Sequence, residues 1–266
     1  MSEIKNLLPR VCYEGTHKDL VPLSGQWLGN ERMTSYEGQC EISFLELAVF
    51  RPLIDSIYKV FGIKDSCSKA ISHQCGFIVD VINDKTTKFV FLVNEVLDEL
   101  CKAEKEINAV GEPKFRLGTR YYTLVVKIEA IVWCNSSILD QVSRLADILF
   151  EQSGYALQDR PKFGNHRRMK SEIVLVKQYV ELLNQFEKIN ISHNIRNALS
   201  HEKKLILIPF NTSGSWNFGI CPGENPGYLA EDFIQKLTTE LYELTQYLEQ
   251  FFIRMLNDKV SAKKPN

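Results

Sequence analysis

Glycine and proline are placed so that four long stretches of this 266-residue chain contain neither residue. The stretches are residues 77–110, 119–153, 165–208 and 228–264. Because proline and glycine interrupt helices, uninterrupted stretches of this length are typical of long helices. Apolar residues make up 44% of the chain, which is enough for each helix to bury one face in a common core. The sequence therefore predicts an all-α protein built as a helical bundle.

Hydrophobic periodicity locates two of the helices. Across residues 120–150, alternating steps of three and four connect apolar residues, and Asn135 is the single polar residue of this series. The same steps connect apolar residues across 233–255. Since such steps bring side chains to one face of an α-helix, both segments are predicted to be amphipathic helices.

Other segments are predicted to be helical from shorter patterns. We expect helices over residues 42–61, 88–107 and 170–188, and a short further segment over 192–203. The first of these contains Pro52 and is expected to break or kink there, because proline removes a backbone donor. Residues 63–86 fit a helix and a strand equally well.

One segment has the pattern of a β-hairpin. In residues 205–220 an apolar run is followed by a Ser/Gly turn and by a second short apolar run. This order predicts a small β-hairpin inserted in the helical bundle, directly after the short helical segment.

The simplest partition is one helical domain with short extensions. Residues 1–40 are rich in turn formers and are predicted to be an N-terminal arm or cap. Residues 41–260 form the helical domain, and residues 261–266 are expected to be a disordered tail. A division into two subdomains near residues 111–118, where glycines flank a proline, is the alternative.

The charge balance and the positions of cysteine and histidine limit the partners and cofactors that we expect. Lys and Arg number 32 against 33 Asp and Glu, so a strongly basic nucleic-acid coat is excluded, whereas a local basic patch is not. The seven cysteines form no C-x-x-C pair, and the five histidines show no zinc-site spacing. We therefore expect reduced thiols, no structural metal and no cofactor.

We also expect no contact with a membrane. No run approaches the ~18 continuous apolar residues that a membrane helix needs. The first residues of the chain show no apolar stretch like that of a signal peptide. These observations predict a cytoplasmic protein.

The string most informative about function is IRNALSH, residues 195–201. It places Arg196, Asn197 and His201 on a predicted helix. At about 100° per residue, Asn197 and His201 lie about 40° apart, so the amide is expected to hydrogen-bond to the imidazole or orient it. Arg196 and His201 lie about 140° apart. They converge only if the arginine wraps around the helix or a second helix completes the cleft.

These residue types suit the cleavage of a phosphodiester without a metal ion. An imidazole can take the proton from a ribose 2′-hydroxyl or give one to the leaving 5′-oxygen. A guanidinium offers forked donors to phosphate oxygens and stabilises the charge of the transition state.

The string resembles the hallmark of the HEPN superfamily of helical-bundle proteins: arginine, a polar residue, three or more residues, then histidine. The match consists of Arg196, Asn197 and His201, and the similar helical context covers about residues 119–256. The resemblance implies a HEPN-type bundle with metal-independent endoribonuclease activity. It also implies a homodimer in which two motif helices form a joint cleft. His201 would be the general acid/base, Arg196 the phosphate clamp and Asn197 the orienting residue. Members commonly serve in toxin or antiviral defence systems, which implies an antitoxin or another defence-system partner.

A basic run precedes the motif. Residues 160–170 contain no acidic residue and concentrate five cations, namely Arg160, Lys162, Arg167, Arg168 and Lys170. We interpret them as candidate contacts to RNA phosphates, and His193, eight residues before His201, as a further substrate-binding candidate. A solvated loop and a histidine at a helix start explain the same residues equally well.

Each motif residue also has a purely structural interpretation. His201 would stabilise the C-terminus of a helix, and Arg196 would form an ion pair with Glu187 or Glu129. Asn135 would either face the cleft or be a buried residue that sets helix register. Some proteins of the HEPN type are not enzymes. The alternative function is therefore a non-catalytic helical module for binding or dimerisation.

Overall fold

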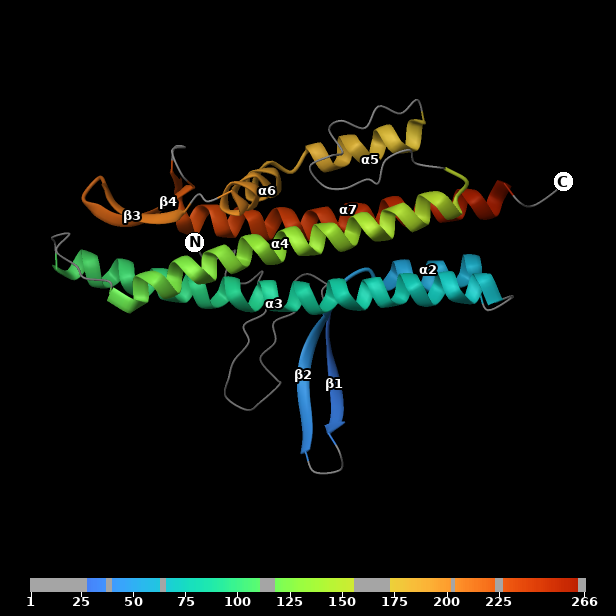
Figure 1. Ribbon diagram of the computed structural model, residues 1–266, viewed down its shortest axis with the longest axis horizontal. Coiled ribbons are helices and arrows are strands. Elements are labelled where there is room, and N and C mark those ends of the chain that lie inside the picture. The colour runs from blue at the N-terminus through green and yellow to red at the C-terminus, as the bar shows by residue number, and fades with distance from the viewer. Residues whose placement is uncertain are drawn as a thin grey trace.

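The two longest helices, α3 (Ser66–Val110) and α4 (Gly118–Gln152), lie side by side and antiparallel in the computed structural model (Figure 1). The structure describes residues 28–36, 40–62, 66–110, 118–155, 173–201, 204–222 and 227–262. Side-chain bonds join the two helices at intervals: Lys85 to Ser137, Lys127 to Glu99 and Arg120 to Glu106. The helix predicted over 120–150 is confirmed. The described part of the ambiguous segment 63–86, from Ser66 on, is also helical and continues into the helix predicted over 88–107.

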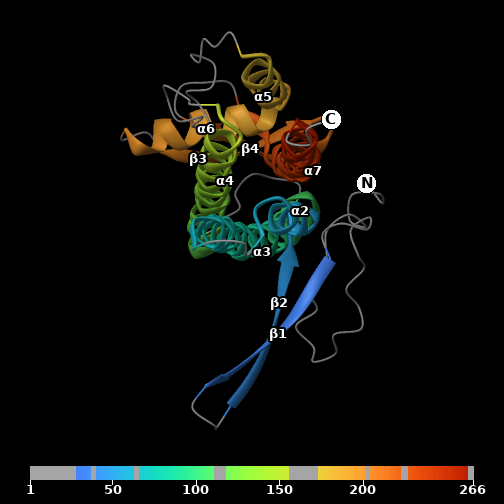
Figure 2. The same cartoon turned by 90° about the vertical axis from the view of Figure 1, so that its right-hand side faces the viewer.

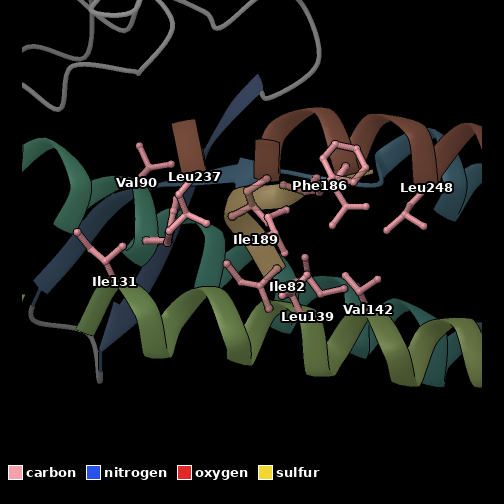
Figure 3. Packing of buried hydrophobic residues seen from close by; sticks show 14 of the residues in the cluster. Ile82, Val90, Ile131, Leu139, Val142, Phe186, Ile189, Leu237 and Leu248 are labelled. Atoms are coloured by element: carbon pink, nitrogen blue, oxygen red, sulfur yellow. The ribbon is translucent and has the colours of Figure 1, made fainter. Parts of the chain in front are cut away.

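Two further helices complete the main layer of the bundle. Helix α7 (Ala230–Ala262) lies along α4, and α2 (Arg51–Phe61) packs on both α3 and α7 (Figures 1 and 2). Their apolar faces meet in one core, as Figure 3 shows for Ile82 and Val90 of α3, Ile131, Leu139 and Val142 of α4, and Leu237 and Leu248 of α7. The periodic positions read from the sequence are therefore the buried ones, and the described residues are mostly helical.

The segment that carries the motif is divided into two helices. Helix α5 (Val174–Asn184) ends where Gln185 and Phe186 intervene, and α6 (Glu187–Ser200) begins directly after them. The prediction of one helix over 170–188 was wrong at this break. Phe186 takes an extended backbone (φ −94, ψ 93) while its side chain is buried in the core (Figure 3). The break is a tertiary effect, because neither glycine nor proline marks it in the sequence.

The hairpin predicted over 205–220 is present. Strands β3 (Leu205–Thr212) and β4 (Ser215–Pro222) pair antiparallel, and the short β5 (Tyr228–Leu229) extends the sheet in the order β3-β4-β5. The turn has two residues, Ser213 and Gly214, both with positive φ (54 and 86), as in the turns that suit the twist of a hairpin. All-α is therefore correct only in the coarse sense, since a small antiparallel sheet accompanies the helices.

Side chains of the long helices hold this sheet against the bundle. The Asn108 side chain of α3 exchanges two hydrogen bonds with the backbone of Trp216 (2.7 and 3.1 Å). The Tyr121 hydroxyl of α4 accepts the Leu207 N–H at 3.2 Å. These bonds fix β3 and β4 on the long helices, and β3 begins at Leu205, four residues after the motif histidine.

The prediction for residues 42–61 was wrong over its first half. Strand β2 (Cys40–Ala48) pairs antiparallel with β1 (Leu28–Tyr36), and this hairpin projects away from the helices (Figures 1 and 2). Around Ile42 and Phe44, apolar residues alternate with Glu41 and Ser43, the two-residue period of a strand. Pro52 lies in the first turn of α2, where its missing N–H costs nothing, so it starts the helix rather than kinks it.

Several of the expected domain boundaries fall on residues that the structure does not describe. The predicted arm over 1–40 contains β1, whereas residues 1–27 and 37–39 lie outside the described residues. Residues 111–117, where a division into subdomains is the alternative, also lie outside them. Helix α7 continues to Ala262, so residues 261 and 262 of the predicted tail are helical, and residues 263–266 lie outside the described residues.

Helix α4 is long and apolar enough, by length and composition, to cross a membrane. Of its most apolar stretch, 44% is buried inside the protein. A core helix meets the same criterion, and α4 is packed against α3, α6 and α7.

Candidate functional site

Helix α6, which carries the motif, starts on α7. The Glu240 carboxylate of α7 accepts the backbone N–H groups of Lys188 (2.6 Å) and Ile189 (3.1 Å) in the first turn of α6. These donors have no partner within the helix, so the carboxylate acts as a cap supplied by another element. Burial raises the pKa of Glu240, and the two backbone hydrogen bonds oppose that shift. The start of the motif helix is thereby fixed on α7.

The middle of α6 crosses α4 at a buried polar contact. The Asn135 amide of α4 donates to the Ser192 hydroxyl of α6 at 3.1 Å, and both side chains are fully buried. The Asn135 carbonyl oxygen has no hydrogen-bond partner among the described residues. Asn135 therefore sets where the two helices cross and does not reach the surface near the motif.

The C-terminal part of α6 carries the motif. Figure 2 shows α6 lying across α7 and α4, with its end continuing past α4 toward β3. The Arg196 guanidinium lies over the indole of Trp133 of α4, with its central carbon 5.1 Å from the ring centroid. Its Nη1 donates to the Asn197 side-chain oxygen at 3.1 Å. The arginine is thus held from α4 and from its own helix.

The charge of Arg196 is not neutralised within the described part of the protein. None of the carboxylates there pairs with it, and its buried Nε has no hydrogen-bond partner among the same residues. Of the two acids considered as partners, Glu187 lies 3.4 Å from the Lys188 ammonium instead, and Glu129 makes no ion pair with the arginine. Within the described residues, Arg196 is therefore a half-buried cation without a counter-ion.

His201 lies just outside the helix. It follows the last helical residue with φ −114 and ψ 43, its side chain is exposed, and its backbone N–H donates to the Ala198 carbonyl at 3.0 Å. The expected contact from Asn197 is not made, because the amide oxygen is engaged by Arg196 and His201 has left the helical path. Within the described residues, the imidazole is not hydrogen-bonded by another side chain.

Of the predicted substrate-binding residues, the structure describes His193 but not the basic run. His193 is half-buried on α6, one residue after Ser192 at the crossing with α4. The basic run (Arg160, Lys162, Arg167, Arg168 and Lys170) lies outside the described residues, between Tyr155 and Ile173.

Sequence reasoning missed Trp133. It lies two residues before Asn135 on α4, which is about 200° around the helix and therefore off the apolar face. Its side chain is 43% exposed although it contacts Arg196. A tryptophan on the polar face of an amphipathic helix was the available signal, because tryptophan is on average one of the more buried residue types.

The described residues contain no group of three or more His, Cys, Asp or Glu side chains that could hold a metal ion. Comparisons with protein-family models, with curated proteins and with solved structures yield no match for this chain.

Proposed function

We propose that this protein is a metal-independent endoribonuclease of HEPN type that works as a homodimer in a toxin or defence system. The ribose 2′-hydroxyl would attack the adjacent phosphate and displace the 5′-oxygen. The products are then a 2′,3′-cyclic phosphate and a 5′-hydroxyl. As general acid/base, His201 takes the proton from the 2′-hydroxyl and gives one to the leaving 5′-oxygen, while Arg196 binds the phosphate. In a toxin system, a neutralising antitoxin would be the expected partner.

The observation that carries the proposal is the state of Arg196. It is oriented by Trp133 and Asn197, yet it has no carboxylate partner among the described residues. In a structural ion pair, a carboxylate would balance the charge of the arginine and occupy its donors. An arginine that binds a phosphate has to keep its charge and its outward donors available. His201 lies five residues further along the same helix end, with its side chain in solvent, where RNA can reach it.

The test is incubation of the purified protein with total RNA and with tRNA in the presence of EDTA. Wild type is expected to cleave and to leave 2′,3′-cyclic phosphate ends. Arg196→Ala and His201→Ala are expected to lose at least about 100-fold in rate, the range typical of lost acid/base or charge stabilisation. Arg144→Ala on α4 and His73→Ala on α3 are matched controls, because both side chains are exposed there. Products with 3′-hydroxyl ends contradict the mechanism.

One observation favours the alternative, a non-catalytic helical module for binding or dimerisation. Asn197 bonds to Arg196 and leaves His201 without an orienting side chain among the described residues. A general base normally has such a partner. If none of the three proteins cleaves RNA and all remain folded, the binding module replaces the enzyme.

A further inference from the structure

A stripe of exposed large side chains runs along the outer face of α4. It consists of Tyr122 (71% exposed), Val126 (62%) and Trp133 (43%). Steps of four and seven residues keep these three side chains within about 40° of one another around the helix. Trp133 is the member of the stripe that reaches the end of α6.

Trp133 and Arg196 together offer two kinds of contact in one place. The guanidinium lies over the indole, and the part of the indole that it leaves uncovered is in solvent. No carboxylate in the described part of the chain balances the charge of the guanidinium. An aromatic surface beside an unneutralised guanidinium matches the two parts of a nucleotide, a base that stacks and a phosphate that accepts hydrogen bonds.

We propose that Trp133 is a base-stacking residue of this site, and that the site takes an unpaired nucleotide of single-stranded RNA. This inference rests on the proposed function and specifies its substrate. The base stacks on the exposed indole while its phosphate contacts Arg196, which places the nucleotide beside His201. A base within a duplex is already stacked between its neighbours, so its face is not available to an indole.

The geometry also assigns Trp133 a positioning role. In water a long arginine side chain samples many rotamers. Contact with the indole and with Asn197 restricts that freedom before the substrate binds. Loss of the indole is therefore expected to weaken binding through the base and through the phosphate together. A phenylalanine keeps an aromatic face at the same position and retains most of both contacts.

The experiment measures binding apart from cleavage, in the His201→Ala background. Fluorescence anisotropy of a short labelled single-stranded RNA is compared with that of the same sequence as a duplex. Adding Trp133→Leu is expected to weaken single-strand binding about ten-fold, within the range for loss of one stacked base. Trp133→Phe should stay close to the parent. Tyr122→Leu, on the same stripe but away from Arg196, is the matched control and should change little. Thermal unfolding verifies that each variant is folded.

The outcomes separate this inference from the proposed function. Single-strand binding that depends on Trp133, without cleavage by wild type, supports the stacking role and removes the enzyme. Cleavage by wild type with an unchanged KM in Trp133→Leu removes the stacking role alone. Equal affinity for duplex and single-stranded RNA overturns the inference. So does a Trp133→Leu variant that no longer dimerises but still binds RNA as the parent does. An absence of both binding and cleavage overturns both proposals.

Discussion

At the scale of single residues, the buried amide of Asn135 contributes to the position of the motif helix. Its hydrogen bond to Ser192 joins α4 to α6 within the core. Ser192 lies four residues before Arg196 on α6. An unpaired polar group at such a place is costly, so the pair favours one crossing of the two helices over others that would leave both groups unpaired.

The first prediction concerns this pair. Ser192→Ala should lower the free energy of unfolding by about 1–3 kcal/mol, because it leaves the buried Asn135 amide without an acceptor. Asn135→Ala should lower it by less, because this change also removes the Asn135 carbonyl oxygen that is already unpaired among the described residues. The double variant should lose less than the sum of the single losses, since it leaves no orphaned group. Chemical denaturation of the four proteins measures this coupling. Strictly additive losses would show that the hydrogen bond does not stabilise the crossing.

At the scale of elements, α7 caps two other helices with carboxylates. Glu240 accepts backbone donors at the start of α6, and Glu249 accepts the Leu53 N–H at the start of α2 at 3.2 Å. Glu249 is only 6% exposed. The pKa of its carboxyl is raised by burial, and the bond from Leu53 opposes the shift in part.

The second prediction is a pH dependence with a defined sign. Above the ordinary pKa near 4.5, the unfolded chain has lost the proton of Glu249, whereas the folded protein still holds it. The free energy of unfolding therefore falls as pH rises from about 4.5 to the raised pKa of the folded state. Glu249→Gln keeps an oxygen for the Leu53 N–H and has no charge to bury. The stability of this variant relative to wild type should thus increase over the same interval. A stability difference between Glu249→Gln and wild type that is the same at both ends of this pH interval would contradict the account.

At the scale of the whole molecule, the proposed joint cleft requires two chains. Arg196 lies near the C-terminal end of α6, and His201 directly follows the helix. If the arginine of one chain works with the histidine of the other, a mixture of two inactive variants restores one cleft in every mixed dimer.

The third prediction follows from this arrangement. Arg196→Ala and His201→Ala proteins, mixed after subunit exchange, should recover about a quarter of wild-type ribonuclease activity. Half of the dimers are then mixed, and each of these has one intact cleft of two. Sedimentation before and after mixing checks that the dimers have formed. A mixture as inactive as its components places both residues of a site within one chain.

The sequence alone determined the elements whose pattern is local. Glycine and proline delimit α4 and α7, and steps of three and four identify the faces that they bury. The Ser213–Gly214 turn identifies the β3–β4 hairpin. The motif brought Arg196 and His201 together in one predicted helical segment, although His201 lies just after the end of α6. Each of these features depends on backbone geometry or on side chains a few residues apart, so it can be read along the chain.

Only the tertiary structure decided the features that involve distant residues. Helix α6 begins where it does because Phe186 is buried and Glu240 reaches it from α7. Residues 40–48 form a strand because β1 pairs with them. Trp133 and Arg196 are 63 positions apart in the chain, and they meet because α4 and α6 pack against each other, with the Asn135–Ser192 hydrogen bond at the crossing. Capping, strand pairing and stacking between distant residues all depend on the packing of elements, which local spacing does not encode.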